Sequence, residues 1–101
     1  YYDNLKAVVA YVRRYLVEKT GDERYARLPF ICGSFSLQSR DRSELVVQAQ
    51  KRLAEEDANF HVVDISDGAL QRDRLHFNAQ GAELLGRRMY EQLVRVTDGL
   101  E

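Results

Sequence analysis

Two short apolar segments, separated by a stretch of helix length, constrain the fold of this chain most. The segments FICGSF (residues 30–35) and FHVVDIS (residues 60–66) are rich in β-branched and aromatic residues, which is typical of buried strands. The stretch between them, SRDRSELVVQAQKRLAEED (residues 39–57), has helical spacing of its apolar residues. Two strands connected through one helix favour a right-handed parallel crossover. The sequence therefore predicts an α/β fold with parallel strands.

Amphipathic helices are predicted before the first strand and between the two strands. The first helix ends near Gly21 and places Arg13 and Arg14 on its solvent side. Its apolar side consists of Leu5, Val8, Val9, Val12 and Leu16. The second helix has a start signal, because Asp41 can accept from first-turn amides while Glu44 reaches back. Its inner stripe consists of Leu45, Val46, Ala49 and Leu53.

A third helix is predicted after the second strand, with Asn78 as its N-cap. Its inner side consists of Ala82, Leu85, Met89, Leu93 and Val96. Gly81 and Gly86 weaken a helix by roughly 1 kcal/mol each relative to alanine. We therefore expect these two glycines to allow the close approach of a neighbouring element.

The predicted order is helix, strand, helix, strand, helix, within residues 1–101 as a single domain. Two strands make a thin sheet, whereas parallel sheets normally have several strands and both faces covered. We therefore expect the chain to be part of a larger fold. We also expect residues 99–101 to include a cloning remnant, because the closing Leu100-Glu101 pair is common ahead of purification tags.

The charge and composition exclude several classes of function. The 15 basic and 16 acidic residues give a net charge of −1 and are well mixed, so neither nucleic acid nor a membrane surface is an expected partner. No apolar run approaches the roughly 20 residues that span a bilayer. Cys32 is the only cysteine, so no disulfide can form within the chain and no multi-cysteine metal site can be built.

The segment QRDRLHFNAQG (residues 71–81) carries the most suggestive chemistry. It follows the second strand, and ligands of open α/β sheets bind beyond the carboxyl ends of the strands. The spacing of three residues lets Asp73 accept from Nδ1–H of His76, which leaves Nε2 free to take a proton from a nucleophile. Leu75 and Phe77 flank the imidazole, and we expect them to anchor the turn in the core.

The block RDRLHFNAQGAELLGRRMYEQL resembles the last conserved block of the SGNH-hydrolase superfamily, in the branch of sialate O-acetylesterases and acetylxylan esterases. YYDNLKAVVAYVRRYL and LPFICGSF are similar to the helix and strand that precede this block. The resemblance implies the C-terminal portion of a flavodoxin-like three-layer α/β/α SGNH-hydrolase fold, acting on acetylated carbohydrates without a cofactor. It implies that His76 is the general base and Asp73 its orienting partner, and that the serine nucleophile and oxyanion donors precede this segment.

Other residues offer weaker alternatives. Ser34 follows a strand and precedes Asp73 and His76, but it lacks the G-x-S-x-G elbow of a nucleophile. Cys32 in an apolar strand is more typical of a buried hydrophobe than of a reactive thiol. His61 is interpreted as a packed or surface histidine, and no pair of histidine and cysteine residues has zinc-ligand spacing. The remaining polar candidates are interpreted as strand-end, turn or solvated positions; they are Asp64, Asp67, Arg40, Arg42, Arg87 and Arg88.

Two further hypotheses compete with the esterase fragment. The chain could be a small non-catalytic α/β interaction module in which Asp73 and His76 only shape a turn. We also expect the exposed edge of the first strand to promote self-association into a homo-oligomer.

Overall fold

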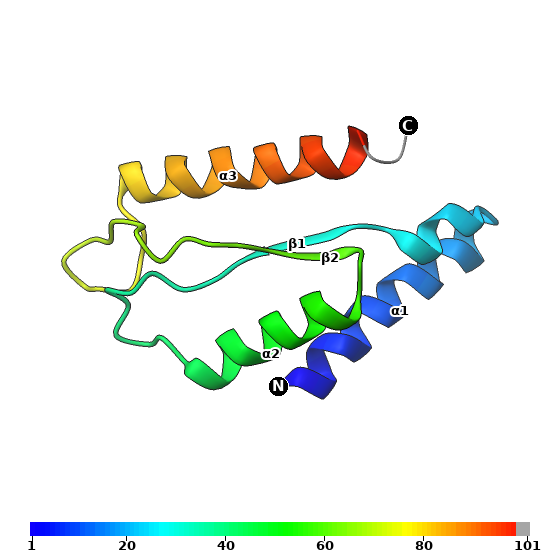
Figure 1. Ribbon diagram of the computed structural model, residues 1–101, viewed down its shortest axis with the longest axis horizontal. Helices are drawn as coiled ribbons and strands as arrows, with labels where there is room; N and C mark the ends of the chain where they lie inside the picture. Colours follow the sequence, from blue (N-terminus) through cyan, green and yellow to red (C-terminus); the bar gives the residue numbers. More distant parts are fainter. Residues whose placement is uncertain (99–101) are drawn as a thin grey trace.

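The computed structural model describes residues 1–98, so the predicted remnant at residues 99–101 lies outside the described residues. The elements follow the predicted order, with one additional short 3₁₀ helix. They are α1 (Tyr2–Thr20), η1 (Glu23–Arg27), β1 (Phe30–Gly33), α2 (Glu44–Glu56), β2 (Phe60–Val63) and α3 (Ala79–Asp98). The sheet lies between α3 on one face and α2 on the other, and α1 packs beside α2 (Figure 1).

The two strands are parallel, which confirms the predicted α/β crossover. Phe30 pairs with Phe60 and Gly33 with Val63. Within residues 1–98 the sheet consists of these two strands, so each strand has one edge without a strand neighbour in this part of the chain. The predicted self-association through such an edge stays a prediction.

Local signals explain most of the helix ends. Gly21 adopts φ 71° and its N–H donates to the carbonyl of Val17, so α1 ends where the sequence predicts. The predicted cap at Asp41 is wrong, because the chain is still turning there and the N–H of Arg42 donates to the carbonyl of Ser39. Ser43 caps α2 instead, since its Oγ accepts from the N–H of Val46 at 3.3 Å.

The core forms where α1, α2 and β2 meet. Val9, Leu53 and Phe60 are its buried members, each no more than 3% exposed. Four residues predicted to face inward do not: Val8 is 57% exposed, Leu45 is 78% exposed, Leu93 is 46% exposed, and Ala82 is exposed as well. The buried face of α2 is rotated away from Leu45 and contains Val47, Ala49, Gln50 and Leu53.

Arg13 ties the N-terminal ends of the strands to α1, although the sequence placed it on the solvent side. Its side chain is only 13% exposed and pairs with the Asp57 carboxylate at 2.6 Å. The same guanidinium donates to the carbonyls of Leu28 at 2.9 Å and Asn59 at 3.1 Å. Planar guanidinium groups suit such multiple contacts, so Arg13 closes this end of the sheet.

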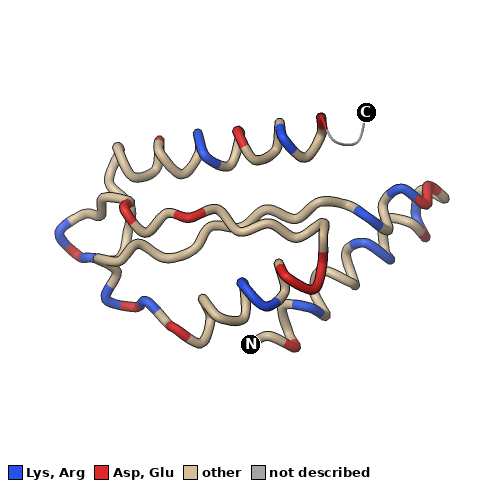
Figure 2. The backbone as a smooth tube through the Cα atoms, viewed as in Figure 1, with Lys and Arg blue, Asp and Glu red and all other residues tan. Residues whose placement is uncertain are grey.

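Both signs of charge occur on each helix (Figure 2). In the part of the chain that the structure describes, no helix has the length and apolarity needed to cross a membrane.

The first turn of α3 requires a glycine at residue 81. The Asn78 side chain caps the helix as predicted, accepting from the N–H of Gly81 at 2.9 Å. A Cβ added at Gly81 would lie 2.2 Å from the carbonyl oxygen of Ala69, whereas nothing lies within 4 Å of one added at Gly86. The close approach predicted at both glycines is therefore confirmed at Gly81 and wrong at Gly86.

We expect Gly81→Ala to lower the free energy of unfolding by about 1–3 kcal/mol, because the added methyl group must displace a backbone carbonyl. Gly86→Ala is the matched control in the same helix, and we expect it to raise stability by up to about 1 kcal/mol. Urea titration followed by circular dichroism measures both changes. Equal stability of the two variants would contradict the close packing described at Gly81.

Candidate active site

The loop that connects β2 to α3 folds back on itself and carries Asp73 and His76 near its tip. Leu70 and Phe77 form an isolated antiparallel bridge. Inside this bridge, the N–H of Gln71 donates to the carbonyl of His76 at 2.8 Å. The loop leaves the carboxyl end of β2, which is where ligand sites of open α/β sheets are found.

Asp73 and His76 are in contact, as their spacing predicts. Nδ1–H of His76 donates to Oδ2 of Asp73 at 2.6 Å. Oδ1 of Asp73 accepts from the backbone N–H groups of Leu75 at 2.9 Å and His76 at 3.1 Å. One carboxylate therefore holds both the backbone and the imidazole of the turn.

These three hydrogen bonds stabilise the ionised form of the carboxylate. The bond from His76, followed by the bonds from the two backbone amides, lowers the pKa of Asp73 from 3.8 to about 2. An ionised carboxylate can only accept hydrogen bonds, so in the neutral imidazole the proton lies on Nδ1. The lone pair of Nε2 is then available to accept a proton.

The imidazole is open to solvent. The side chain of His76 is 68% exposed and that of Asp73 is 39% exposed. Among residues 1–98, Nε2 of His76 has no hydrogen-bond partner. A proton acceptor with a fixed partner on Nδ1 and a free Nε2 is the arrangement that general-base catalysis requires.

We expect the carboxyl group of Asp73 to titrate with a midpoint near pH 2 in the folded chain, and His76→Ala to move that midpoint toward 3.8. Because the folded pKa is depressed, the contribution of the pair to stability is complete above about pH 4. This contribution to stability is lost as the pH falls through about 2. Carbon NMR of the side-chain carboxyl groups measures the midpoint, and a wild-type value near 3.8 would contradict the contact.

The two flanking hydrophobic residues behave differently. Phe77 anchors the loop: its ring lies 2.8 Å from the place of a Cβ at Gly68 and 2.9 Å from one at Gly81. The predicted anchoring by Leu75 is wrong, because Leu75 is 39% exposed. Of the two residues that flank His76, Phe77 alone therefore anchors the loop.

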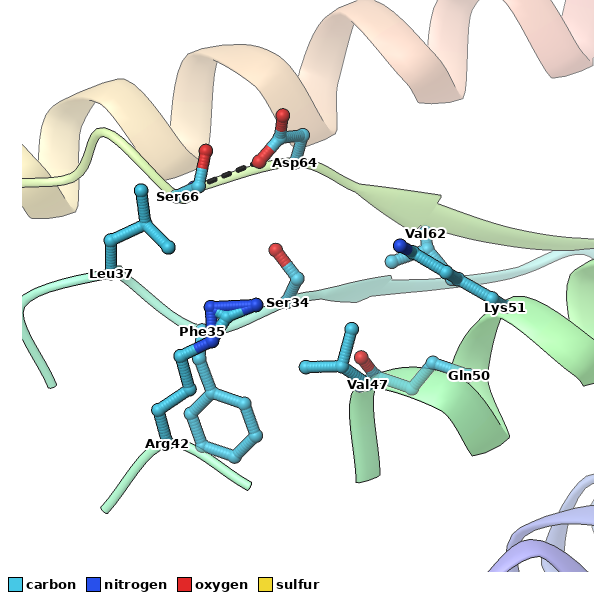
Figure 3. Close-up of a pocket in the computed structure, with 10 residues that line it drawn as sticks. All are labelled: Ser34, Phe35, Leu37, Arg42, Val47, Gln50, Lys51, Val62, Asp64 and Ser66. Carbon is cyan, nitrogen blue, oxygen red and sulfur yellow. Dashed lines mark hydrogen bonds between the residues drawn. The ribbon is translucent and has the colours of Figure 1, made fainter. Parts of the chain in front are cut away.

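A cavity of about 440 Å³ lies between α2 and the carboxyl ends of the strands (Figure 3). Ser34 and Asp64 both line it. Oγ of Ser34 accepts from the N–H of Ile65 at 3.2 Å, and among the described residues no hydrogen bond joins Ser34 to His76. Gln50 also lines the cavity; its Nε2 donates to the carbonyl of Gly33 at 3.2 Å, while its buried Oε1 has no partner within residues 1–98.

Cys32 and His61 are not brought to the Asp73–His76 pair. Cys32 lies in β1 and packs against the core cluster, and burial raises the pKa of its thiol. His61 lies half-buried in β2. In the described part of the chain, no group of three or more His, Cys, Asp or Glu side chains is arranged to hold a metal ion.

Asp64 closes a turn after β2, as interpreted from the sequence, whereas Asp67 pairs with α3. Oδ1 of Asp64 accepts from the N–H of Ser66 at 2.8 Å. Asp67 forms a two-pronged pair with Arg88 at 2.6 and 2.9 Å, and Arg88 also donates to the carbonyl of Asp64 at 2.9 Å. Arg88 lies at the surface, as interpreted, and it also connects α3 to the end of β2. Arg42 pairs with Glu44 at 3.0 Å and lines the cavity.

A comparison with known protein families identifies the family of this chain. The family model described as "carbohydrate esterase, sialic acid-specific acetylesterase" matches residues 1–95. The chain belongs to this acetylesterase family. No curated protein and no solved structure matches it. Its helices around a parallel two-stranded sheet are consistent with part of an α/β/α hydrolase fold.

Proposed function

We propose that Asp73 and His76 are the acid-base part of the catalytic triad of a serine esterase that removes acetyl groups from carbohydrate esters. The contact between Asp73 and His76, with Nε2 left free, is the observation that carries this proposal. Membership of the acetylesterase family supports an acetylated carbohydrate as the substrate. The exposure of His76 supports it as well, because a substrate must reach the imidazole.

In the proposed mechanism, Nε2 of His76 takes the proton of a serine hydroxyl while the serine oxygen attacks the acetyl carbonyl. The tetrahedral intermediate collapses, His76 returns the proton to the departing sugar oxygen, and an acetyl-serine ester remains. A water molecule then attacks this ester as His76 takes its proton. The second collapse releases acetate and restores the serine, while Asp73 stabilises the imidazolium in both halves.

We further propose that the serine lies on a segment that precedes Tyr1 in the complete protein, which makes residues 1–98 the C-terminal part of the esterase domain. Ser34 is a poor alternative, since it lacks the G-x-S-x-G elbow and, among residues 1–98, its Oγ is hydrogen-bonded to the N–H of Ile65 and not to His76. Cys32 is a poor alternative as well, because burial raises the pKa of its thiol.

One observation favours the second candidate, a non-catalytic interaction module. Oδ1 of Asp73 accepts two backbone N–H groups, which would close the turn even without chemistry. In such a module the imidazole would only complete the turn. The two functions differ in whether a serine becomes acylated.

Labelling with a fluorophosphonate tests the proposal. We expect a protein that carries this chain together with its preceding segment to be labelled on a serine before Tyr1, and we expect the label to require His76. The chain alone should stay unlabelled and should not hydrolyse p-nitrophenyl acetate. Labelling of Ser34, or labelling that His76→Ala leaves unchanged, would contradict the proposed triad.

A further inference from the structure

The turn between Asp73 and His76 contains an unusual backbone conformation. Arg74 has φ 57°, and among residues 1–98 it is the only residue other than glycine with a positive φ. Side chains with a Cβ rarely adopt this left-handed region, because the Cβ approaches the following carbonyl oxygen. The reversal of the chain at Arg74 places the N–H groups of Leu75 and His76 on the carboxylate of Asp73.

A strained residue of this kind persists where its surroundings hold it. Here the surroundings are residues 36–40, which we call the brace. The N–H of Arg40 donates to the carbonyl of Arg74 at 3.0 Å. Nε of Arg74 donates to the carbonyl of Gln38 at 3.2 Å. The two loop tips therefore lie side by side, at the left end of Figure 2.

The brace is fixed to the rest of the protein through Ser36. Ser36 is only 2% exposed. Its hydroxyl donates to the carbonyl of Gly68 at 2.7 Å and accepts from the N–H of Gln38 at 3.2 Å. The N–H of Leu37 donates to the carbonyl of Ser66 at 2.9 Å. The loop after β1 is thereby joined to the loop after β2 at a buried point.

We propose that Arg74 is a positioning residue for His76, and that the brace holds Arg74 in the left-handed conformation that keeps the imidazole on Asp73. The chain of contacts runs from the buried Ser36 through Gln38 and Arg40 to Arg74, and from there to the pair. The catalytic consequence rests on the proposed esterase function, whereas the positioning can be measured in the isolated chain.

The test compares side chains that differ in their tolerance of a positive φ. We expect Arg74→Val to disrupt the turn, because a β-branched residue is strongly disfavoured there. Its Asp73 titration midpoint should move from about 2 toward 3.8. We expect Arg74→Gly to keep most of the wild-type midpoint, because glycine adopts this conformation freely. Arg72→Val, two positions earlier in the same loop, is the matched control and should leave the midpoint unchanged.

Ser36→Ala tests the brace without replacing any residue of the turn. We expect it to move the Asp73 midpoint in the same direction as Arg74→Val while Arg74 remains in place. In the serine-bearing protein, Arg74→Val should lower kcat by about 10²-fold, as expected for a catalytic group displaced by about 1 Å, with KM little changed.

An unchanged Asp73 midpoint in folded Arg74→Val would overturn the proposal, and so would an equal shift in Arg72→Val. If Arg74→Val does not fold, Arg74→Ala gives a milder version of the same comparison with Arg74→Gly, and equal midpoints in these two would overturn it. If the midpoints shift as expected but the serine-bearing protein hydrolyses no ester, the positioning stands and the esterase function fails.

Discussion

Replacing His76 by alanine is expected to lower kcat for acetyl ester hydrolysis by about 10⁶-fold in the protein that joins this chain to its serine-bearing segment. The imidazole would be the group that takes the serine proton, and its Nδ1–H is fixed on Asp73 at 2.6 Å. Asp73→Asn should reduce kcat by about 10⁴-fold, because an asparagine amide no longer favours a proton on Nδ1. Release of acetate from an O-acetylated sugar measures both effects.

The sequence supplies a closely matched control for Asp73. Asp41 stands in an identical RDR triplet at residues 40–42, and its nearest ion-pair contact is with Arg40 at 4.0 Å. We expect Asp41→Asn to leave kcat within about twofold, consistent with an exposed surface pair. Residues that act as one unit have non-additive effects, so the Asp73→Asn/His76→Ala double variant should be no slower than the slower single variant. Multiplied losses would show that the two side chains act independently.

Phe60→Ala is expected to lower the free energy of unfolding by about 3–5 kcal/mol. Phe60 is 3% exposed and lies in the cluster with Val9 and Leu53. The variant loses the burial of an aromatic ring and leaves a cavity where α1, α2 and β2 meet. A chain of this length has about 5–15 kcal/mol of stability in total, so the variant should be partly or wholly unfolded at 37 °C.

Tyr90→Ala is the control for this core variant, since Tyr90 is an aromatic residue that is 66% exposed on α3. We expect its free energy of unfolding to stay within about 0.5 kcal/mol of the wild type. Denaturant midpoints and slopes separate a change in stability from a change in the unfolded state. A loss below about 1 kcal/mol in Phe60→Ala would mean that the cluster is not the main core.

The elements could be predicted from the sequence because the spacing of apolar residues sets both strands and all three long helices. The exact inner face was harder to predict. Leu45 has the hydrophobicity of a core residue and is 78% exposed, while the polar Gln50 is 7% exposed. Periodicity does not distinguish these positions, since the rotation of α2 depends on how the strands and the loop before Ser43 place it.

The candidate site could also be predicted only in part. Asp73 and His76 are three residues apart, so one turn can bring them together and local spacing predicts their contact. The residues that support this turn lie far from it in the sequence: Ser36 bonds to Gly68, and Arg40 bonds to Arg74. Most of these bonds use backbone groups, which leave no signal in the identity of the residues. The left-handed conformation of Arg74 could not be predicted from the sequence either, because glycine, not arginine, is the usual residue in this conformation.

The tautomer of His76 tests the central claim most directly. Nitrogen NMR of the chain, at a pH where the imidazole is neutral, distinguishes a proton on Nδ1 from a proton on Nε2. The contact with Asp73 predicts a proton on Nδ1 and a free Nε2 in the wild type, and a loss of this preference in Asp73→Asn. A wild-type imidazole with its proton on Nε2, or one that Asp73→Asn leaves unchanged, would contradict the proposed catalytic pair.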